Sequence, residues 1–350
     1  NSYDLLKGLK KGGIFVLNCL WDIGELEENL PKNLLREIAE KDIEFYCINA
    51  IGIAEEIGLG NRINMIMQGA FFKLTEIIPE EDAKQYLKES VQKAYGKKGE
   101  KVVGMNLQAI ERGFTDIRKV QVSDQWKRYS GEIKKETEEP EFIAKIMRPM
   151  NRQEGDLLPV SAFSGIEDGT FPSGTSAYEK RGIGVNVPEW NEETCIQCNQ
   201  CSYICPHACI RPFLLTEEEK AEAPESFKTQ KAKGKGLEQY YFRMQVTTMD
   251  CTGCGNCADI CPARPKALVM KKLGTQSKTE VPNWEYAVEH VSYKGDLVEG
   301  RTVKDSQFKT PLMEYSGACA GCGETPYIKL ITQLYGTRMM IANATGCSSI

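Results

Sequence analysis

Two copies of one cysteine pattern constrain this 350-residue chain more than any other feature. Each copy has the spacing C-x2-C-x2-C-x3-C and is closed by a proline, Pro206 in the first and Pro262 in the second. The eight cysteines are Cys195, Cys198, Cys201, Cys205, Cys251, Cys254, Cys257 and Cys261. With this spacing, one tight loop presents three thiolates to a [4Fe–4S] cube, while the fourth cysteine ligates the other cube.

The spacing therefore predicts two crossed ligand sets. They are Cys195, Cys198 and Cys201 with Cys261, and Cys251, Cys254 and Cys257 with Cys205. Cubes that exchange a ligand must lie close together, which makes them a pathway for electrons. A pair of zinc sites is the main alternative, because C-x2-C also begins many zinc motifs. Zinc has no use for a third cysteine two residues on or for a crossed fourth, so the pattern favours clusters.

Charge and hydrophobicity exclude several classes of protein. The 44 basic and 49 acidic residues give a net charge of −5, without the basic footprint of a nucleic-acid-binding protein. No apolar run is long enough to span a membrane, and no secretory signal is visible. Fourteen cysteines without an export signal favour a reducing, cytoplasmic setting and metal rather than disulfides. The first residue is not Met and the last ones resemble a strand-to-helix turn, so we expect an internal piece of a larger protein.

The N-terminal third has the pattern of an α/β domain. An apolar strand at 13–18, a helix from Pro31 to about 40 and a strand at 43–49 predict a parallel βαβ unit. Further helices are predicted at 61–77, 80–95 and 100–112. Cys19, Cys47 and Cys209 lie outside the repeated pattern and are expected to pack as small hydrophobic residues.

The remaining segments are less regular. A polar stretch at 123–140 indicates a domain border, and the Gly-, Pro- and Ser-rich stretch at 151–188 indicates a structured connector. Between the two cysteine copies, 206–250 is expected to contain a solvated insertion, which favours a surface loop over a docking site for a carrier. Residues 266–270 match the closing strand of a ferredoxin repeat.

A third cysteine group follows near the C-terminal end. Cys319 and Cys322 form another C-x2-C, and Cys347 lies downstream. Three ligands are incomplete for a cube, so a third cluster needs a thiolate from outside this chain. A thioredoxin-like pair or part of a zinc knuckle fits the same spacing.

Together these residues closely resemble the single-chain pyruvate:ferredoxin (flavodoxin) oxidoreductase family. Residues 12–18 and 57–72 look like its γ-type domain, 178–190 look like its Glu-Lys-Arg stretch, and the paired cysteine copies look like its inserted ferredoxin domain. Ala318–Tyr327 and Ala342–Ile350 look like the opening of its thiamine-diphosphate domain.

The resemblance implies a multidomain chain of α/β and α+β class. It places the C-terminal part of a γ-type α/β domain at 1–133 and a connector at 134–175. A ferredoxin-like domain with two [4Fe–4S] clusters follows at 176–292, and a thiamine-diphosphate-binding α/β domain starts at 293–350.

The function implied is oxidative decarboxylation of pyruvate with CoA to acetyl-CoA and CO2. Electrons would pass through thiamine diphosphate with Mg²⁺ and three [4Fe–4S] clusters to ferredoxin or flavodoxin, usually in a homodimer. By resemblance, Cys319, Cys322 and Cys347 hold the cluster nearest thiamine, completed by a cysteine outside this chain, and Glu324 and Cys347 also lie near that cofactor. The family's activating glutamate, substrate arginine and Mg²⁺ ligands match nothing here, so this segment alone is expected to be inactive.

Two alternatives remain open from the sequence. The first is a polyferredoxin-type subunit that transfers electrons without catalysis, which the third cysteine group and the flanking α/β domain disfavour. The second is an oxidoreductase for another 2-oxo acid, against which a continuous chain argues by analogy only.

Overall fold

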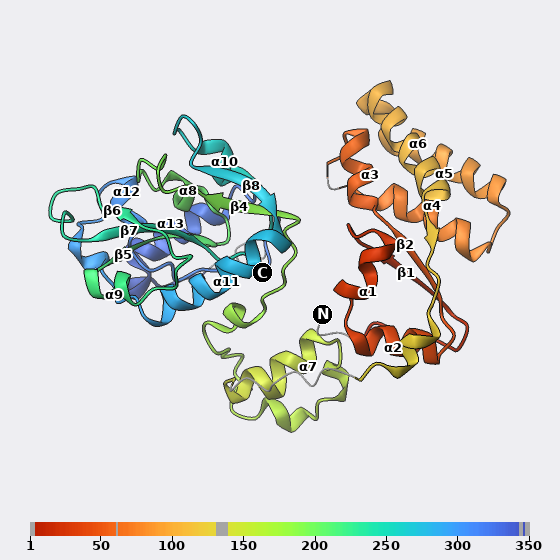
Figure 1. The fold of residues 1–350 in the computed structure, drawn as a ribbon, viewed down its shortest axis with the longest axis horizontal. Coiled ribbons are helices and arrows are strands. Elements are labelled where there is room, and N and C mark those ends of the chain that lie inside the picture. The colour runs from red at the N-terminus through yellow and green to blue at the C-terminus, as the bar shows by residue number, and fades with distance from the viewer. Residues whose placement is uncertain (1–3, 61, 131–138, 343–345, 347–350) are drawn as a thin grey trace. The chain divides into compact units, whose positions relative to one another are not determined.

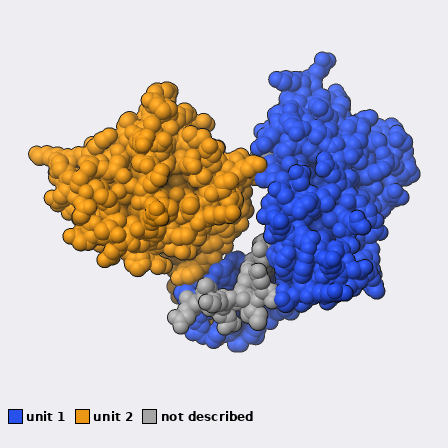
Figure 2. All heavy atoms as spheres, in the orientation of Figure 1, with its two compact units in different colours: residues 1–162 blue, residues 163–350 orange. Residues whose placement is uncertain are grey.

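The computed structural model describes residues 4–60, 62–130, 139–342 and 346. The chain divides into two compact units, 1–162 and 163–350 (Figure 2). Cys347 lies outside the described residues, as does part of the polar stretch at 123–140. Within the described ranges, no helix combines the length and the apolar character needed to cross a membrane.

The first unit contains the predicted parallel βαβ arrangement. Strand β1 (Ile14–Asn18) pairs in parallel with β2 (Glu44–Ile48), and α2 (Lys32–Glu40) connects them (Figure 1). The short strand β3 (Arg118–Lys119) adds antiparallel to β2. Leu35 and Ile38 on α2 are fully buried, as its spacing of apolar residues requires. The βαβ prediction is therefore confirmed.

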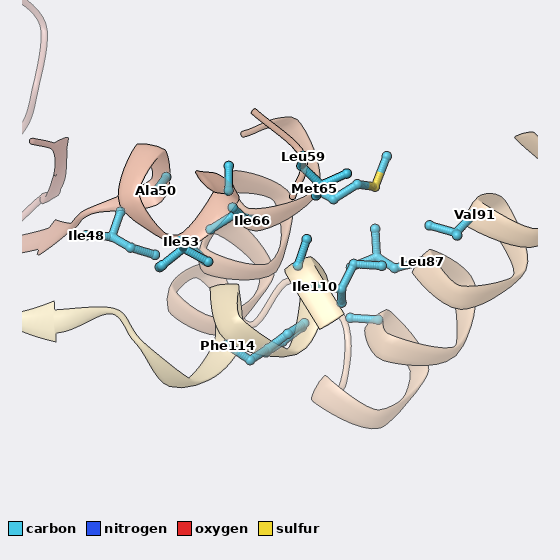
Figure 3. Close-up of a cluster of buried hydrophobic side chains, with 14 residues drawn as sticks. Ile48, Ala50, Ile53, Leu59, Met65, Ile66, Leu87, Val91, Ile110 and Phe114 are labelled. Atoms are coloured by element: carbon cyan, nitrogen blue, oxygen red, sulfur yellow. The ribbon is translucent and has the colours of Figure 1, made fainter. Parts of the chain in front are cut away.

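Helices form the rest of this unit around a second apolar cluster. They are α3 (Ala50–Ile57), α4 (Asn64–Thr75), α5 (Glu80–Tyr95) and α6 (Glu100–Thr115), whereas Leu26 of the short helix α1 (Leu26–Asn29) belongs to the cluster that contains α2. Figure 3 shows this cluster, which runs from Ile48 to Phe114. Helices α4 and α6 touch at Gly113, where an added Cβ would lie only 2.2 Å from the carbonyl oxygen of Ile66. The three helices predicted at 61–77, 80–95 and 100–112 are confirmed as α4, α5 and α6.

The connecting segment has little regular structure, as its composition predicts. It contains one π-helical turn (Ile143–Met147), helix α7 (Arg148–Asn151) and single 3-10 turns such as Gly155–Leu157 and Thr175–Tyr178. The division between the two units falls inside the stretch 151–188.

The second unit is built from two small sheets and short helices. Strand β4 (Asn186–Trp190) pairs antiparallel with β8 (Leu268–Lys272), which is the predicted closing strand. The other sheet has the order β5 (Ile210–Leu215), β7 (Tyr241–Val246), β6 (Gln230–Lys231). The helices are α8 (Gln200–Ile204), α9 (Glu217–Ala221), α10 (Asn256–Ile260), α11 (Leu273–Glu289), α12 (Val303–Ser306) and α13 (Thr325–Tyr335). Much of the expected insertion at 206–250 is therefore an ordered part of a sheet.

Candidate iron–sulfur sites

The two cysteine loops share one backbone conformation. The residue two positions after the first cysteine has a positive φ in both copies, +59° at Gln197 and +70° at Gly253. The residue four positions after the first cysteine also has a positive φ in both copies, +58° at Asn199 and +82° at Gly255. These left-handed turns curl the chain so that successive thiols face the same side. They suit glycine, and side chains other than glycine need support there.

Side-chain hydrogen bonds supply that support in the first loop. The buried Gln197 amide donates to the carbonyl of Lys231 at 2.7 Å and accepts from the backbone N–H of Lys233 at 2.7 Å. The buried Asn199 amide donates to the carbonyl of Lys304 at 2.9 Å. The first loop is thus fixed to two segments distant in sequence, whereas the second relies on glycine.

A pocket lies beside the first loop, and we call it cavity 1. Its lining includes Cys195, Cys198 and Cys201 from the first copy and Cys261 from the second. The rest is mostly apolar, from β4, β7, β8 and the loop after Cys261, and includes Trp190, Met244 and Leu268.

A second pocket, cavity 2, has the complementary set of thiols. Its lining includes Cys251, Cys254 and Cys257 from the second copy and Cys205 from the first. Cys209 also lines it, although it lies outside the repeated spacing. The structure therefore brings together both predicted sets of four, and ligation by these eight thiolates stays a prediction.

The chemistry of both linings fits an iron–sulfur cube. Each cavity is lined by a residue with a buried ring nitrogen that has no oxygen or nitrogen partner among the described residues, the indole nitrogen of Trp190 in cavity 1, which faces the Cys195 sulfur, and Nε2 of His207 in cavity 2. Donors of this kind suit cluster sulfur, whose hydrogen bonds tune the reduction potential. No three His, Cys, Asp or Glu side chains in the described ranges converge on a point for one metal ion. A cube does not need that, because each thiolate binds a different iron.

Burial keeps most of these thiols protonated until a metal displaces the proton. It raises the pKa of Cys251 to about 12 and raises the pKa of Cys201 and Cys257 strongly. Cys205 differs, because a hydrogen bond from the Cys209 thiol, and then the charge of Lys329, hold its pKa well below the usual value despite burial. The Cys205 sulfur also accepts the backbone N–H of Cys209 at 3.3 Å. Cluster assembly should therefore release protons.

The third cysteine group lies next to cavity 2. Cys319 is exposed and Cys322 is half-buried, in the loop before α13. An added Cβ on Gly321, between them, would lie 3.6 Å from Cβ of Cys254. Earlier in the same segment, the backbone N–H of Tyr315 donates to the carbonyl of His207 at 3.0 Å. Both loops that line cavity 2 therefore contact the segment that carries the third group.

The two cofactor residues predicted for thiamine are described only in part. Glu324 is exposed immediately before α13, and its backbone N–H donates to the Cys322 sulfur at 3.4 Å. Cys347 lies outside the described residues. Of the cysteines expected to pack as hydrophobic residues, Cys47 and Cys209 are buried and Cys19 is partly buried against the core beside β1 and β2.

Sequence reasoning missed the residues that hold the loops. Gln197 and Asn199 could have been found by aligning the two copies, because glycines occupy the same places in the second. Lys329 gave no local signal, because it reaches Cys205 from 124 residues away.

Comparisons with known proteins agree with the order of these parts. Residues 1–115 match the family described as pyruvate ferredoxin/flavodoxin oxidoreductase, and residues 194–264 match a 4Fe-4S dicluster domain. Residues 130–184 match a domain of unknown function designated EKR.

Whole-chain relatives carry related names. A pyruvate-flavodoxin oxidoreductase of Enterobacter agglomerans is 56% identical over 100% of this chain and 30% of its own length. A pyruvate:ferredoxin oxidoreductase of Moorella thermoacetica is 53% identical over 99% of this chain and 30% of its own. The mitochondrial pyruvate dehydrogenase [NADP(+)] of Euglena gracilis is 46% identical over 99% of this chain and 19% of its own. The chain thus spans about 30% of the length of the first two relatives.

Proposed function

We propose that this chain, which belongs to the pyruvate ferredoxin/flavodoxin oxidoreductase family, is the electron-carrying segment of an enzyme that oxidises pyruvate with CoA to acetyl-CoA and CO2. When bound, thiamine diphosphate with Mg²⁺ supplies the electron sink for decarboxylation, and [4Fe–4S] clusters supply one-electron transfer. The residues described here hold the route for the electrons.

One observation carries this proposal: the two cavities share both cysteine copies. Helix α8 contains Cys201, which lines cavity 1, and ends at Cys205, which lines cavity 2. Helix α10 contains Cys257 of cavity 2 and ends at Cys261 of cavity 1. A single helical turn therefore separates ligands of neighbouring clusters, which keeps the two clusters close enough for electron transfer.

The contacts of the third cysteine group indicate the order of the clusters along the route. Since Gly321 packs against Cys254, a cluster on Cys319, Cys322 and Cys347 would lie beside cavity 2. Electrons from the thiamine side would then pass to cavity 2 and next to cavity 1.

The surface beside cavity 1 suits an acidic one-electron carrier of the ferredoxin or flavodoxin class. Ile196, which lines the cavity, is 52% exposed. Four lysines, which we call the basic rim, lie on the segments that hold the first loop: Lys231, Lys233, Lys235 and Lys304. None of them forms an ion pair within the described part of the chain, and the charges nearest Lys304 are those of Asp305, Lys233 and Cys198. Unpaired cations around an exposed apolar residue attract an acidic partner and fix its orientation.

The proposed function can be tested by measuring the iron, acid-labile sulfide and thiamine diphosphate in the intact protein. The intact protein, purified anaerobically, should contain about twelve irons with matching acid-labile sulfide, since three cubes contain four each. It should also bind thiamine diphosphate and reduce ferredoxin or flavodoxin only when pyruvate and CoA are present. Zinc in place of iron would refute the electron route. Iron without thiamine binding would favour a non-catalytic electron-transfer subunit.

A further inference from the structure

A buried lysine binds the end of the helix that links the two cavities. Lys329 on α13 is 1% exposed, and its Nζ donates to the carbonyl oxygens of Ser202, Tyr203 and Cys205. The last two distances are 3.2 Å each. Three acceptors occupy all three N–H donors of an ammonium group, so these contacts describe the charged side chain.

The charge of Lys329 has no carboxylate partner. No ion pair joins it to an acidic side chain in the ranges that the structure describes, whereas the neighbouring cation Arg211 pairs with Glu314. A buried charge costs several kcal/mol unless other groups compensate it. Besides the cation Arg211, Lys329 faces the sulfur atoms of Cys205, Cys201 and Cys209, and the first two become negative thiolates when they bind a cluster. The ammonium is therefore placed as a counter-charge to the thiolates at the junction of the cavities.

The second cysteine copy has a related but more exposed arrangement. Nζ of Lys266 donates to the carbonyls of Ala258 at 2.6 Å and Asp259 at 3.2 Å, and Arg264 donates to the carbonyl of Cys261 at 3.5 Å. These carbonyls hold the same places in the repeat as those that Lys329 binds. Lys266 is only half-buried and Arg264 is exposed, so water screens both charges. The two copies thus differ in how strongly a cation acts on the ligand helix.

We propose that Lys329 raises the reduction potential of the cluster held by Cys205 and acts less on the cluster held by Cys261. This inference rests on the proposed electron route. Reduction adds one negative charge to a cluster and its thiolates, and a fixed cation in a low-dielectric interior stabilises that charge. Lys329 is thereby a positioning and tuning residue rather than a ligand.

Redox titration followed by EPR tests this role in the intact protein, with iron counted in every sample. In Lys329→Met, the reduced-to-oxidised ratio of the Cys205 cluster at a fixed potential should fall at least tenfold, which is 59 mV for one electron. Lys329→Gln, which keeps N–H donors but loses the charge, should shift it similarly. The matched control Lys266→Met should shift this cluster less.

Three results would overturn the proposal. They are an unchanged midpoint in an iron-replete Lys329→Met protein, a wild-type midpoint in Lys329→Gln, and loss of iron from cavity 2 in both variants. The last result would show that Lys329 is only a structural cap. Absence of iron from the unmodified protein would instead refute the proposed function itself.

Discussion

Double cysteine variants can distinguish crossed from uncrossed ligand sets by iron count. Cys205 and Cys254 belong to different copies of the motif but line the same cavity, whereas Cys198 lines the other. Removing one or more of the four ligands from a cavity should prevent assembly there, whereas a cavity that keeps all four should assemble its cube. Since a cube contains four irons, Cys205→Ala/Cys254→Ala should lose about four irons per chain, and Cys205→Ala/Cys198→Ala about eight.

The assay is iron and acid-labile sulfide per chain after anaerobic purification, with the EPR spectrum of the reduced protein. Cys209→Ser is the matched control, because Cys209 lines cavity 2 and is 2% exposed but lies outside the predicted sets. It should keep the full iron content. The crossed sets would be refuted by the opposite losses, eight irons for the Cys205/Cys254 double variant and four for the Cys205/Cys198 double variant. A loss of four irons in Cys209→Ser would refute the predicted choice of four ligands for cavity 2.

Three further predictions concern the rim and the stability of each unit. Lys233→Glu should slow reduction of the carrier several-fold at low ionic strength and only slightly at high salt. The control Lys97→Glu, at an exposed lysine outside the basic rim, should leave the rate unchanged. Stopped-flow rates that show no salt dependence would contradict the role of the basic rim in binding the carrier. Burial opposes ionisation of Glu219, but Lys294 lowers its pKa from 4.5 to about 2, so its stabilisation is complete above pH 4.5 and is lost as the pH falls towards 2. Glu219→Gln should therefore cost about 2–3 kcal/mol in urea unfolding at pH 7 and nothing below pH 2, and an equal cost at both pH values would contradict this. Gly113→Ala should destabilise the first unit by about 1–3 kcal/mol in thermal unfolding, because its Cβ would meet a carbonyl of α4, and an unchanged midpoint would show that the helices separate freely.

Sequence patterns predicted the helices and strands that are determined by residues close together in the chain. The apolar run at 13–18 became β1, and Pro79 with its acidic first turn was followed by α5. The cysteine spacing also indicated which thiols meet, because the four-residue step from Cys201 to Cys205, or from Cys257 to Cys261, spans about one helical turn.

What the sequence could not show depends on contacts between distant residues. The lysine-rich segment 231–235 reads as a solvated loop, yet the side chain of Gln197 binds its backbone from 34 and 36 residues away. Lys329 reads as an ordinary helix residue, and only the packing of α13 against α8 reveals it as a buried charge. These roles depend on where the residues lie in the folded chain, which neither residue type nor hydrophobic periodicity predicts.

The differences between the two cysteine loops explain the order of the sites in the proposed electron route. Both loops need the same left-handed turns, but Gly253 packs so closely that a Cβ would lie 2.8 Å from the carbonyl oxygen of Asn186. The second loop therefore has no side chain at this place to bind a further segment, and Gly321 of the third group can pack beside Cys254. The first loop instead uses Gln197 to bind the segment of the basic rim. The two loops thus place cavity 2 beside the third cysteine group and cavity 1 beside the basic rim, which is the order of sites that the proposed electron route requires.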